Sequence, residues 1–341
     1  MPTDVGTSGT LFIIAKTAEI FKSEGGYTYN MKFTGLGRQI RQPSAENRII
    51  VPRSTPINSV RTRFSGSGSV EFILTKNAEL ALKNARPMIS NYPVGSAALT
   101  KDKGGRLWIV RGANIEFRND HAIHPEESIC VSLAVDETVQ RIVTLNGKKE
   151  IISPCGNSRE ALLTYSATDA RFLKAKGEWM LIKDLLPSRP IKKVRELSPE
   201  DQLLIDQARE IISDSYVPYT KTKKAAVILT RSGMPFLGTA QDDVTFHHHH
   251  AIEVALDALH ARGFDKIKAV VRLSAGKEVD PPCGRCLQKL FEESQKGRTE
   301  FKVIASNGES AMVGAISQLL PLAFGPKDLG VDLGKFYHDN S

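Results

Sequence analysis

The sequence repeats one order of predicted elements at a spacing of roughly 125 residues. In each copy a helix precedes a hairpin, and helices then alternate with strands. The hairpin turns are marked by Lys-Gly-Gly at 103–105 in the first copy and by Ser-Gly at 232–233 in the second. Helices that alternate with strands are typical of α/β domains. We therefore expect an α/β protein built from two copies of one domain.

The chain divides into three predicted units. Residues 1–77 form a basic N-terminal module rich in Gly, Ser and Thr. Its short alternating runs at 48–53 and 70–75 predict strands, so we expect a small β-rich module, followed by a helix over 76–85. The first copy spans 78–190 and the second 191–341.

Bulk properties narrow the class of protein. With 41% hydrophobic and 25% charged residues, the 341-residue chain has an ordinary globular composition. The net charge of +8 favours phosphate-bearing partners without defining a site. No apolar run approaches the roughly 20 residues that span a bilayer, and four cysteines are too few for a disulfide framework. We expect a soluble, cytoplasmic protein that does not enter a membrane.

The motif Pro-Pro-Cys-Gly-Arg-Cys at 281–286 opens a predicted helix. Its thiols, Cys283 and Cys286, are one turn apart, and the positive helix end favours thiolates that can chelate one zinc ion. The run His247–His250 precedes the helix that begins near Ala251. One histidine and two cysteines leave the fourth zinc position open for water, as in catalytic sites. The alternatives are a redox-active or structural Cys-x-x-Cys and a solvated histidine loop.

Both copies carry motifs that resemble the cytidine deaminase superfamily over roughly residues 80–341. The segments that carry this resemblance are Gly-Ala-Asn-Ile-Glu (112–116), His-Pro-Glu (124–126), Pro-Cys-Gly-Asn-Ser (154–158), Tyr-Val-Pro-Tyr (216–219), the 281–286 motif and the tail at 319–329. The tandem arrangement is similar to the dimeric two-copy cytidine deaminases. The extra N-terminal module resembles that of the Bdellovibrio-type deaminase family.

The resemblance implies a three-layer α/β/α sandwich with a mixed sheet in each copy, and a zinc ion at the N-termini of two helices. It also implies that Asn114 and Glu116 bind the substrate. Helices like the one over 251–263 commonly form subunit contacts in this superfamily, so the resemblance implies a homodimer.

The first copy departs from the family pattern at Ser158, which stands where the second zinc-binding cysteine belongs. A neutral hydroxyl is a poor zinc ligand, so His124 and Cys155 alone are expected to hold metal weakly. The proton-carrying glutamate of the family is present as Glu126. We expect a degenerate first copy without zinc.

The second copy has the complete ligand set His250, Cys283 and Cys286, but Ile252 stands where the family's glutamate belongs. Glu253 is one residue later, which turns it about 100° away on a regular helix. Three explanations stay open at this stage. A bulge brings Glu253 to the water, another acid (Asp242, Asp243 or Glu278) replaces it, or zinc binds without turnover. Glu253 is the predicted catalytic residue.

The predicted function is zinc-dependent hydrolytic deamination of a nucleobase, with cytosine favoured over adenine. Ala240 and Asp242 replace the Asn and Glu that bind the free ribose in the family. This replacement favours a nucleic-acid substrate, and therefore nucleic-acid editing, with Asp242 as a predicted substrate contact. One alternative is a free cytidine or deoxycytidine deaminase of nucleoside salvage, with its active site in the first copy. The other is a non-catalytic protein that binds nucleic acid or another partner.

Overall fold

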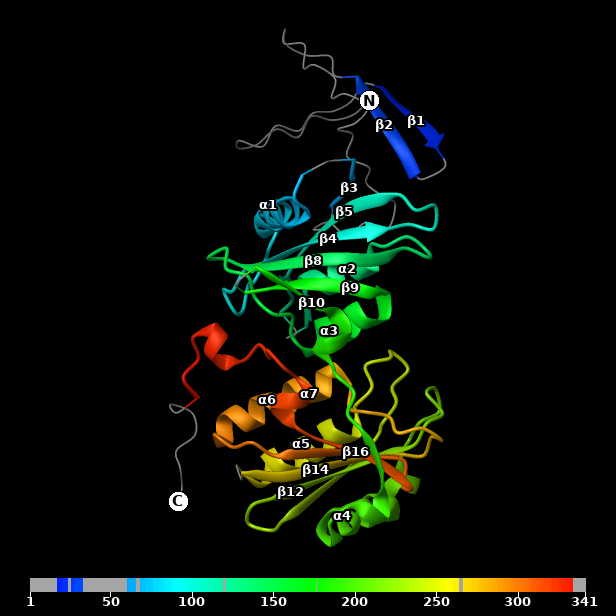
Figure 1. Cartoon of the computed structure of the whole chain (residues 1–341), viewed down its shortest axis with the longest axis vertical. Coiled ribbons are helices and arrows are strands. Elements are labelled where there is room, and N and C mark those ends of the chain that lie inside the picture. The colour runs from blue at the N-terminus through cyan, green and yellow to red at the C-terminus, as the bar shows by residue number, and fades with distance from the viewer. Residues whose placement is uncertain are drawn as a thin grey trace.

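The computed structural model describes residues 17–23, 26–32, 60–65, 68–118, 121–175, 177–263 and 266–333. Within these ranges lie two six-stranded mixed sheets, one in each copy, arranged one after the other along the long axis (Figure 1). The predicted fold class, α/β with two mixed sheets, is confirmed.

The first copy contains α1 (Val70–Leu82), β4 (Val94–Lys101), β5 (Leu107–Ala113), β6 (Ile115–Glu116), β7 (Ala122–Ile123), α2 (Pro125–Val131), β8 (Thr138–Asn146), α3 (Gly156–Tyr165), β9 (Ser166–Lys174) and β10 (Glu178–Leu181). The second contains β11 (Ile191–Lys193), α4 (Pro199–Ile211), β12 (Lys224–Thr230), β13 (Pro235–Thr239), α5 (Ala251–Arg262), β14 (Ile267–Ser274), α6 (Gly284–Gly297), β15 (Lys302–Ser306), β16 (Ser310–Ala315) and α7 (Ile316–Leu319).

The two sheets have matching topology. In the first, β4 pairs antiparallel with β5 and β8, and β8 runs parallel to β9. In the second, β12 pairs antiparallel with β13 and β14, and β14 runs parallel to β15. The parallel pair in each copy is joined by a crossover helix, α3 or α6, as parallel strands require. The repeat seen in the sequence is therefore a repeat of structure.

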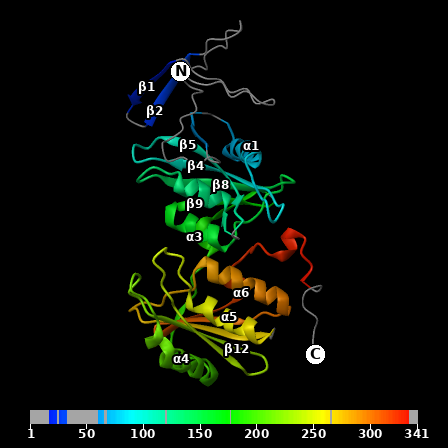
Figure 2. The ribbon, with the colours of Figure 1, turned by 180° about the vertical axis from the view of Figure 1, so that it is seen from behind.

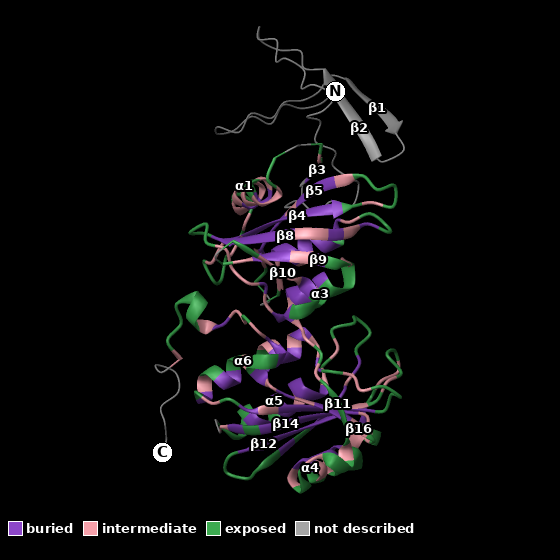
Figure 3. Ribbon diagram, in the orientation of Figure 1, coloured by how far each residue is buried: buried purple, intermediate pink, exposed green. Residues whose placement is uncertain are grey.

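Helices cover both faces of each sheet. In the first copy α1 packs on one face through Leu74 and Ala78, and α2 and α3 pack on the other through Ile129 and Leu162. In the second, α4 covers one face and α5 and α6 cover the other. Helices α3 and α6 contact each other between the two sheets, as both views show (Figures 1 and 2). The cores are continuous along the strands and the inner sides of the helices (Figure 3).

The structure corrects the prediction for residues 70–75, which begin helix α1 and are not a strand. Ser69 caps this helix by accepting a hydrogen bond from the Phe72 amide, and Leu74, Ala78 and Ala81 are buried at helical spacing. The short alternating run was too brief to distinguish a strand from the first turns of a helix. The predicted boundary at residue 77 therefore falls within α1.

Elsewhere in the predicted N-terminal module, β1 (Thr17–Ser23) and β2 (Gly26–Lys32) form an antiparallel hairpin. β3 (Val60–Arg63) pairs with β5 and so belongs to the sheet of the first copy. The predicted strand at 48–53 lies outside the described residues. Across the described ranges, every helix is too short or too polar to cross a membrane.

Candidate active site and metal centre

The four predicted ligand positions His124, Cys155, His250 and Cys283 are the N-cap residues of α2, α3, α5 and α6. In α2 and α5 a glutamate in the first turn accepts a hydrogen bond from the N-cap amide, from His124 to Glu127 at 2.8 Å and from His250 to Glu253 at 3.0 Å. These capping boxes fix where each helix begins. Each copy thus has one histidine and one cysteine at the positive ends of neighbouring helices, where thiolates are favoured.

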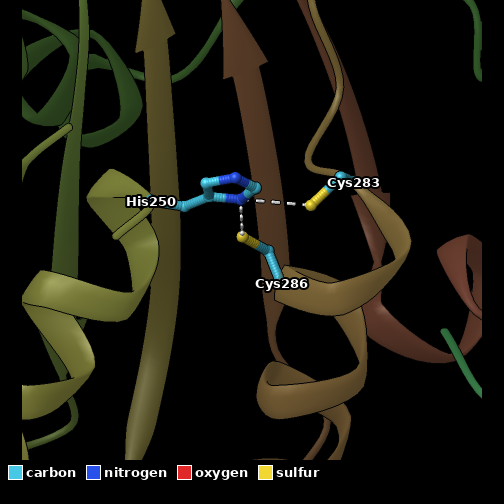
Figure 4. A group of neighbouring side chains, drawn as sticks. All are labelled: His250, Cys283 and Cys286. Atoms are coloured by element: carbon cyan, nitrogen blue, oxygen red, sulfur yellow. Dashed lines mark hydrogen bonds between the residues drawn. The ribbon is translucent and has the colours of Figure 1, made fainter. Parts of the chain in front are cut away.

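In the second copy, His250, Cys283 and Cys286 point toward one another (Figure 4). His250 Nδ1 lies 3.2 Å from the Sγ atom of each cysteine, and the three ligand atoms all lie within 4.8 Å of one another. One imidazole and two thiols are donors that zinc prefers. The donor set therefore fits a zinc ion.

The environment of Cys283 favours the thiolate that zinc requires. A hydrogen bond from Cys286 and the proximity of His250 together hold the pKa of the Cys283 thiol well below its usual value, although burial opposes the shift. The hydrogen bond and burial raise the pKa of Cys286, which is 2% exposed. Of the two thiols, Cys283 is the first to ionise.

The contacts of Glu253, the predicted catalytic residue, place its carboxylate in ion pairs. Besides the His250 amide, it is bound by Arg285 at 2.7 Å and by Lys289 at 2.8 Å. Burial raises the pKa of Glu253, but the Lys289 hydrogen bond and the other contacts outweigh this and lower it. Ile252, at the family position, is 1% exposed in the core. The catalytic role of Glu253 stays a prediction, and its contacts favour a structural role.

A cavity of about 640 Å³ lies at the corresponding place in the first copy. Among the residues that line it are the candidate site residues Asn114, Glu116, His124, Glu126, Cys155 and Ser158 of the first copy and Glu253 of the second. His124 Nδ1 lies 3.0 Å from Cys155 Sγ and 3.5 Å from Ser158 Oγ. The first copy therefore brings together two conventional zinc donors and one hydroxyl, which does not fit firm zinc binding.

Glu126 is one of two buried acids that line this cavity and is 2% exposed; the other is Glu253, which is 5% exposed. The Glu126 carboxylate accepts hydrogen bonds from Thr144 Oγ1 at 2.6 Å and from Ser158 Oγ at 2.9 Å. Ser158 thus links the acid to the histidine and cysteine. This arrangement holds Glu126 in one orientation, as a proton carrier requires.

Asn114 and Glu116 hold the loop that forms one wall of the cavity. The Asn114 side chain accepts from the Val94 amide at 2.9 Å and donates to the Tyr92 carbonyl at 3.0 Å. Glu116 accepts from the amides of Ile89 at 2.7 Å and Ser90 at 2.9 Å. Both residues line the cavity as well as shape it.

Asp242 is the second-copy counterpart of Glu116. Its carboxylate accepts hydrogen bonds from the amides of Tyr219 at 2.9 Å and Thr220 at 2.8 Å, in the loop that precedes β12. Asp242 is not among the described residues that line the cavity. The predicted substrate-binding residues therefore lie in two different copies.

Part of the cavity wall comes from the second copy, and of this part only Glu253 was predicted from the sequence as a site residue. Arg285, Gln288 and Lys289 of α6 line it, together with the C-terminal segment, residues 324–333. One sequence signal pointed to this segment, namely the resemblance of residues 319–329 to the tail of cytidine deaminases. Because the cavity lies between the copies, motifs within one copy describe only part of it.

No family model matches the chain. Its sequence is 25% identical over 243 residues to a cytidine deaminase of Shewanella halifaxensis. The matched region spans 62% of this chain and 75% of that protein. It is 27% identical over 220 residues to the cytidine deaminase of Shewanella amazonensis. Here the matched region spans 58% of this chain and 71% of that protein. By sequence, the chain is thus similar to cytidine deaminases, as its motifs predicted.

Among solved structures, the chain is similar to the cytidine deaminase of Burkholderia pseudomallei, with 25% identity and a TM-score of 0.34 over 38% of this chain and all of that one. It is also similar to the cytidine deaminase of Mycobacterium tuberculosis, with 24% identity and a TM-score of 0.32 over 35% of this chain and 96% of that one. The resemblance to the Bdellovibrio-type family stays a prediction.

Proposed function

We propose that this chain is a hydrolytic deaminase of a free cytosine nucleoside, which binds in the first-copy cavity. The observation that carries the proposal is that Asn114, Glu116 and Glu126 line one cavity with His124 and Cys155. Its volume of about 640 Å³ is that of a small-molecule site. The related proteins are cytidine deaminases, which favours the nucleoside alternative over the nucleic-acid substrate that the sequence first suggested.

The reaction replaces the exocyclic amine of cytosine by the oxygen of water. The water oxygen bonds to C4 while one of its protons passes through a carboxylate to the ring nitrogen, and the second proton accompanies the departing ammonia. Glu126 is suited to this transfer because it is buried and held by Thr144 and Ser158. Asn114 and Glu116 would orient the sugar from the cavity wall.

The second copy is the other candidate location for this chemistry. His250, Cys283 and Cys286 would hold a zinc ion, which when bound lowers the pKa of a coordinated water. Glu253 would carry the proton and Asp242 would contact the substrate. The ligand set favours this location, whereas Ile252 and the ion pairs of Glu253 favour the first copy.

The test measures ammonia release from cytidine, deoxycytidine and a cytosine-containing single-stranded oligonucleotide, with and without added Zn²⁺. We expect turnover of a nucleoside that Asn114→Ala and Glu126→Gln abolish. The location in the first copy is wrong if Cys283→Ser abolishes turnover while folding and nucleoside binding are unchanged. Release from the oligonucleotide alone would restore the nucleic-acid substrate, and no release from any substrate would favour a non-catalytic binding protein.

The homodimer and the cytoplasmic location stay predictions. Sedimentation of the purified full chain tests the first of them.

A further inference from the structure

We propose that a row of aromatic and imidazole rings beside the second-copy donor set binds single-stranded nucleic acid by stacking on its bases. We call this row the ring surface. Its six residues are Phe117 and His121 of the first copy and Tyr219, Phe246, His247 and His248 of the second. None of the six is among the described residues that line the first-copy cavity. The proposal therefore goes beyond the proposed function and does not rest on it.

The rings lie close enough to one another to form a continuous surface across both copies. The centroid of the Phe246 ring lies 5.9 Å from that of Tyr219 and 5.3 Å from that of His248. The His121 ring of the first copy lies 6.0 Å from the His247 ring of the second. Because residues 246–248 are consecutive, one loop of the second copy connects the two groups of rings.

Three of these rings are exposed although they are large and apolar. Phe246 is 69% exposed and Tyr219 is 44% exposed. Phe117, whose ring stacks on His121 with a centroid distance of 6.0 Å, is 42% exposed. Exposed apolar residues that lie together mark interaction sites. Aromatic rings of this kind stack on bases of any sequence, because every base has a flat π-face.

The loop between β13 and α5 is braced in the shape that presents Phe246. Gln241 and His249 exchange two backbone hydrogen bonds of 3.0 Å, and the Asp243 amide donates to His248 Nδ1 at 3.0 Å. The Phe246 amide donates to the Asp243 carbonyl at 3.0 Å. Phe246 has a φ angle of 60°, which is costly for a bulky residue. Such conformations are concentrated at functional sites, and here the conformation belongs to the most exposed ring of the surface.

The charges around the ring surface favour a phosphate-bearing partner. Three exposed basic residues lie within four residues of a ring in the sequence, namely Arg118, Lys221 and Lys223. The described acids within the same span have carboxylates that accept hydrogen bonds from backbone amides, namely Glu116, Asp242 and Asp243. The chain as a whole carries a net charge of +8. Basic residues beside stacking rings are the combination that binds single-stranded nucleic acid.

One side of the ring surface adjoins the second-copy donor set. The loop that carries three of the rings ends at His250, the N-cap of α5. The His248 carbonyl accepts a hydrogen bond at 2.6 Å from Arg285, which stands between Cys283 and Cys286 in the sequence. A strand stacked on the rings would therefore lie beside the three donors.

The experiment measures the binding of fluorescein-labelled single-stranded DNA and RNA of mixed sequence to the full chain by fluorescence anisotropy. We expect wild-type protein to bind these oligonucleotides, and Phe246→Ala and Tyr219→Ala each to raise Kd about 5-fold or more. Phe246→Trp should bind as wild type does, because it keeps a stacking ring. Phe72→Ala is the matched control, since it removes a ring that is 63% exposed on α1, and Kd should not change.

Two further measurements test the phosphate contacts and the location of the strand. Lys221→Gln should reduce the slope of log Kd against log salt concentration by about 1. Ultraviolet crosslinking of wild-type protein should join the oligonucleotide to peptides covering 216–223 or 240–250, and this result does not depend on the folding of any variant.

Several results would overturn the proposal. These are no binding of either oligonucleotide at low salt, crosslinks confined to other peptides, equal losses in Phe246→Ala and Phe72→Ala, and a duplex that binds as tightly as the single strand. A change in sedimentation of Phe246→Ala without oligonucleotide would instead make the ring surface a contact between copies of the chain. Because binding is measured without turnover, a failure to release ammonia contradicts the proposed function alone.

Discussion

Gly156 and Gly284 occupy equivalent positions, each directly after a cysteine that caps a helix, and their backbones touch. A Cβ atom on Gly284 would lie 2.0 Å from the carbonyl oxygen of Gly156, and the converse distance is 1.9 Å. Each amide donates to a side chain four residues along the opposite helix, Gly156 to Gln288 and Gly284 to Glu160. The two copies thus meet through reciprocal contacts at the first turns of α3 and α6.

This contact predicts that Gly284→Ala destabilises the protein. The added methyl has no space, because the atom it meets is backbone, so we expect a loss of about 1–3 kcal/mol in the free energy of unfolding. Urea denaturation measures it. Gly104→Ala is the control, since its Cβ would lie 3.4 Å from the nearest atom, in an exposed turn. Equal stability of the two variants would show that the helices separate readily.

Arg159 binds the start of the C-terminal segment through hydrogen bonds to backbone carbonyls. This side chain is 0% exposed, and its guanidinium donates to the carbonyls of Pro154 and Leu185, to those of Pro321 at 2.6 Å and Leu322 at 2.8 Å, and to Ser153 Oγ. Arg159→Met leaves buried carbonyls unpaired and should cost about 3 kcal/mol or more.

Limited proteolysis of this variant should show earlier cleavage within 321–333, and denaturation should show the loss of stability. Lys103→Ala removes a solvent-exposed ion pair with Asp136, and it should change stability by less than about 0.5 kcal/mol. Unchanged proteolysis in Arg159→Met would mean that other contacts hold the segment.

Glu126→Gln tests the acid of the first-copy cavity. The amide keeps the size of the side chain but cannot accept and release a proton, so turnover of a cytosine nucleoside should fall about 10²–10⁴-fold with little change in nucleoside binding. Steady-state kinetics and calorimetry measure the two effects. Glu127→Gln is a matched control because glutamine also serves in a capping box. A Glu126→Gln variant that keeps wild-type turnover contradicts the assignment.

Cys155 is predicted to be reactive in metal-free protein. Burial alone would lower the pKa of His124 and raise that of Cys155, but the contact between them outweighs burial, raising the pKa of His124 to about 9 and lowering that of Cys155. The thiolate therefore persists as pH falls below 9, and alkylation slows only when pH drops through the lowered pKa. Mass spectrometry of iodoacetamide-treated protein locates the label.

Cys130 is the internal control, because burial and the nearby Glu126 raise its pKa to about 12 and should keep it unlabelled. In His124→Gln the pKa of Cys155 should rise, so labelling at pH 7 should slow several-fold. If His124→Gln leaves the labelling rate at pH 7 unchanged, the pair does not set the ionisation of Cys155.

Glu253→Gln distinguishes the predicted catalytic role from the structural one. If Glu253 carries the proton, turnover should fall by orders of magnitude with zinc content intact. From its contacts we expect the opposite result, a small loss of stability from the weakened pairs with Arg285 and Lys289, and turnover within a few-fold of wild type. Kinetic assays beside thermal unfolding decide between them.

The amino-acid sequence alone predicted the repeated α/β plan, the starts of the helices α4, α5 and α6, and the residues proposed to bind metal. These features are local. A capping serine, a cysteine pair one turn apart and an apolar face each depend on residues close together in the chain, as Ser198 at the start of α4 illustrates. The departures at Ser158 and Ile252 were equally readable, because they fall at fixed places within motifs.

The position of the substrate-sized cavity between the two copies is seen in the folded structure alone. That cavity joins the first-copy motifs to α6 and to residues 324–333, and a sequence pattern does not state which distant segments pack together. The ion pairs of Glu253 were likewise not predictable from the sequence. Its carboxylate on α5 pairs with Arg285 and Lys289 on α6. Packing of one helix against another places the charged partners of Glu253, and packing between the copies places the second-copy wall of the cavity. Both depend on distances between segments that are far apart in the sequence.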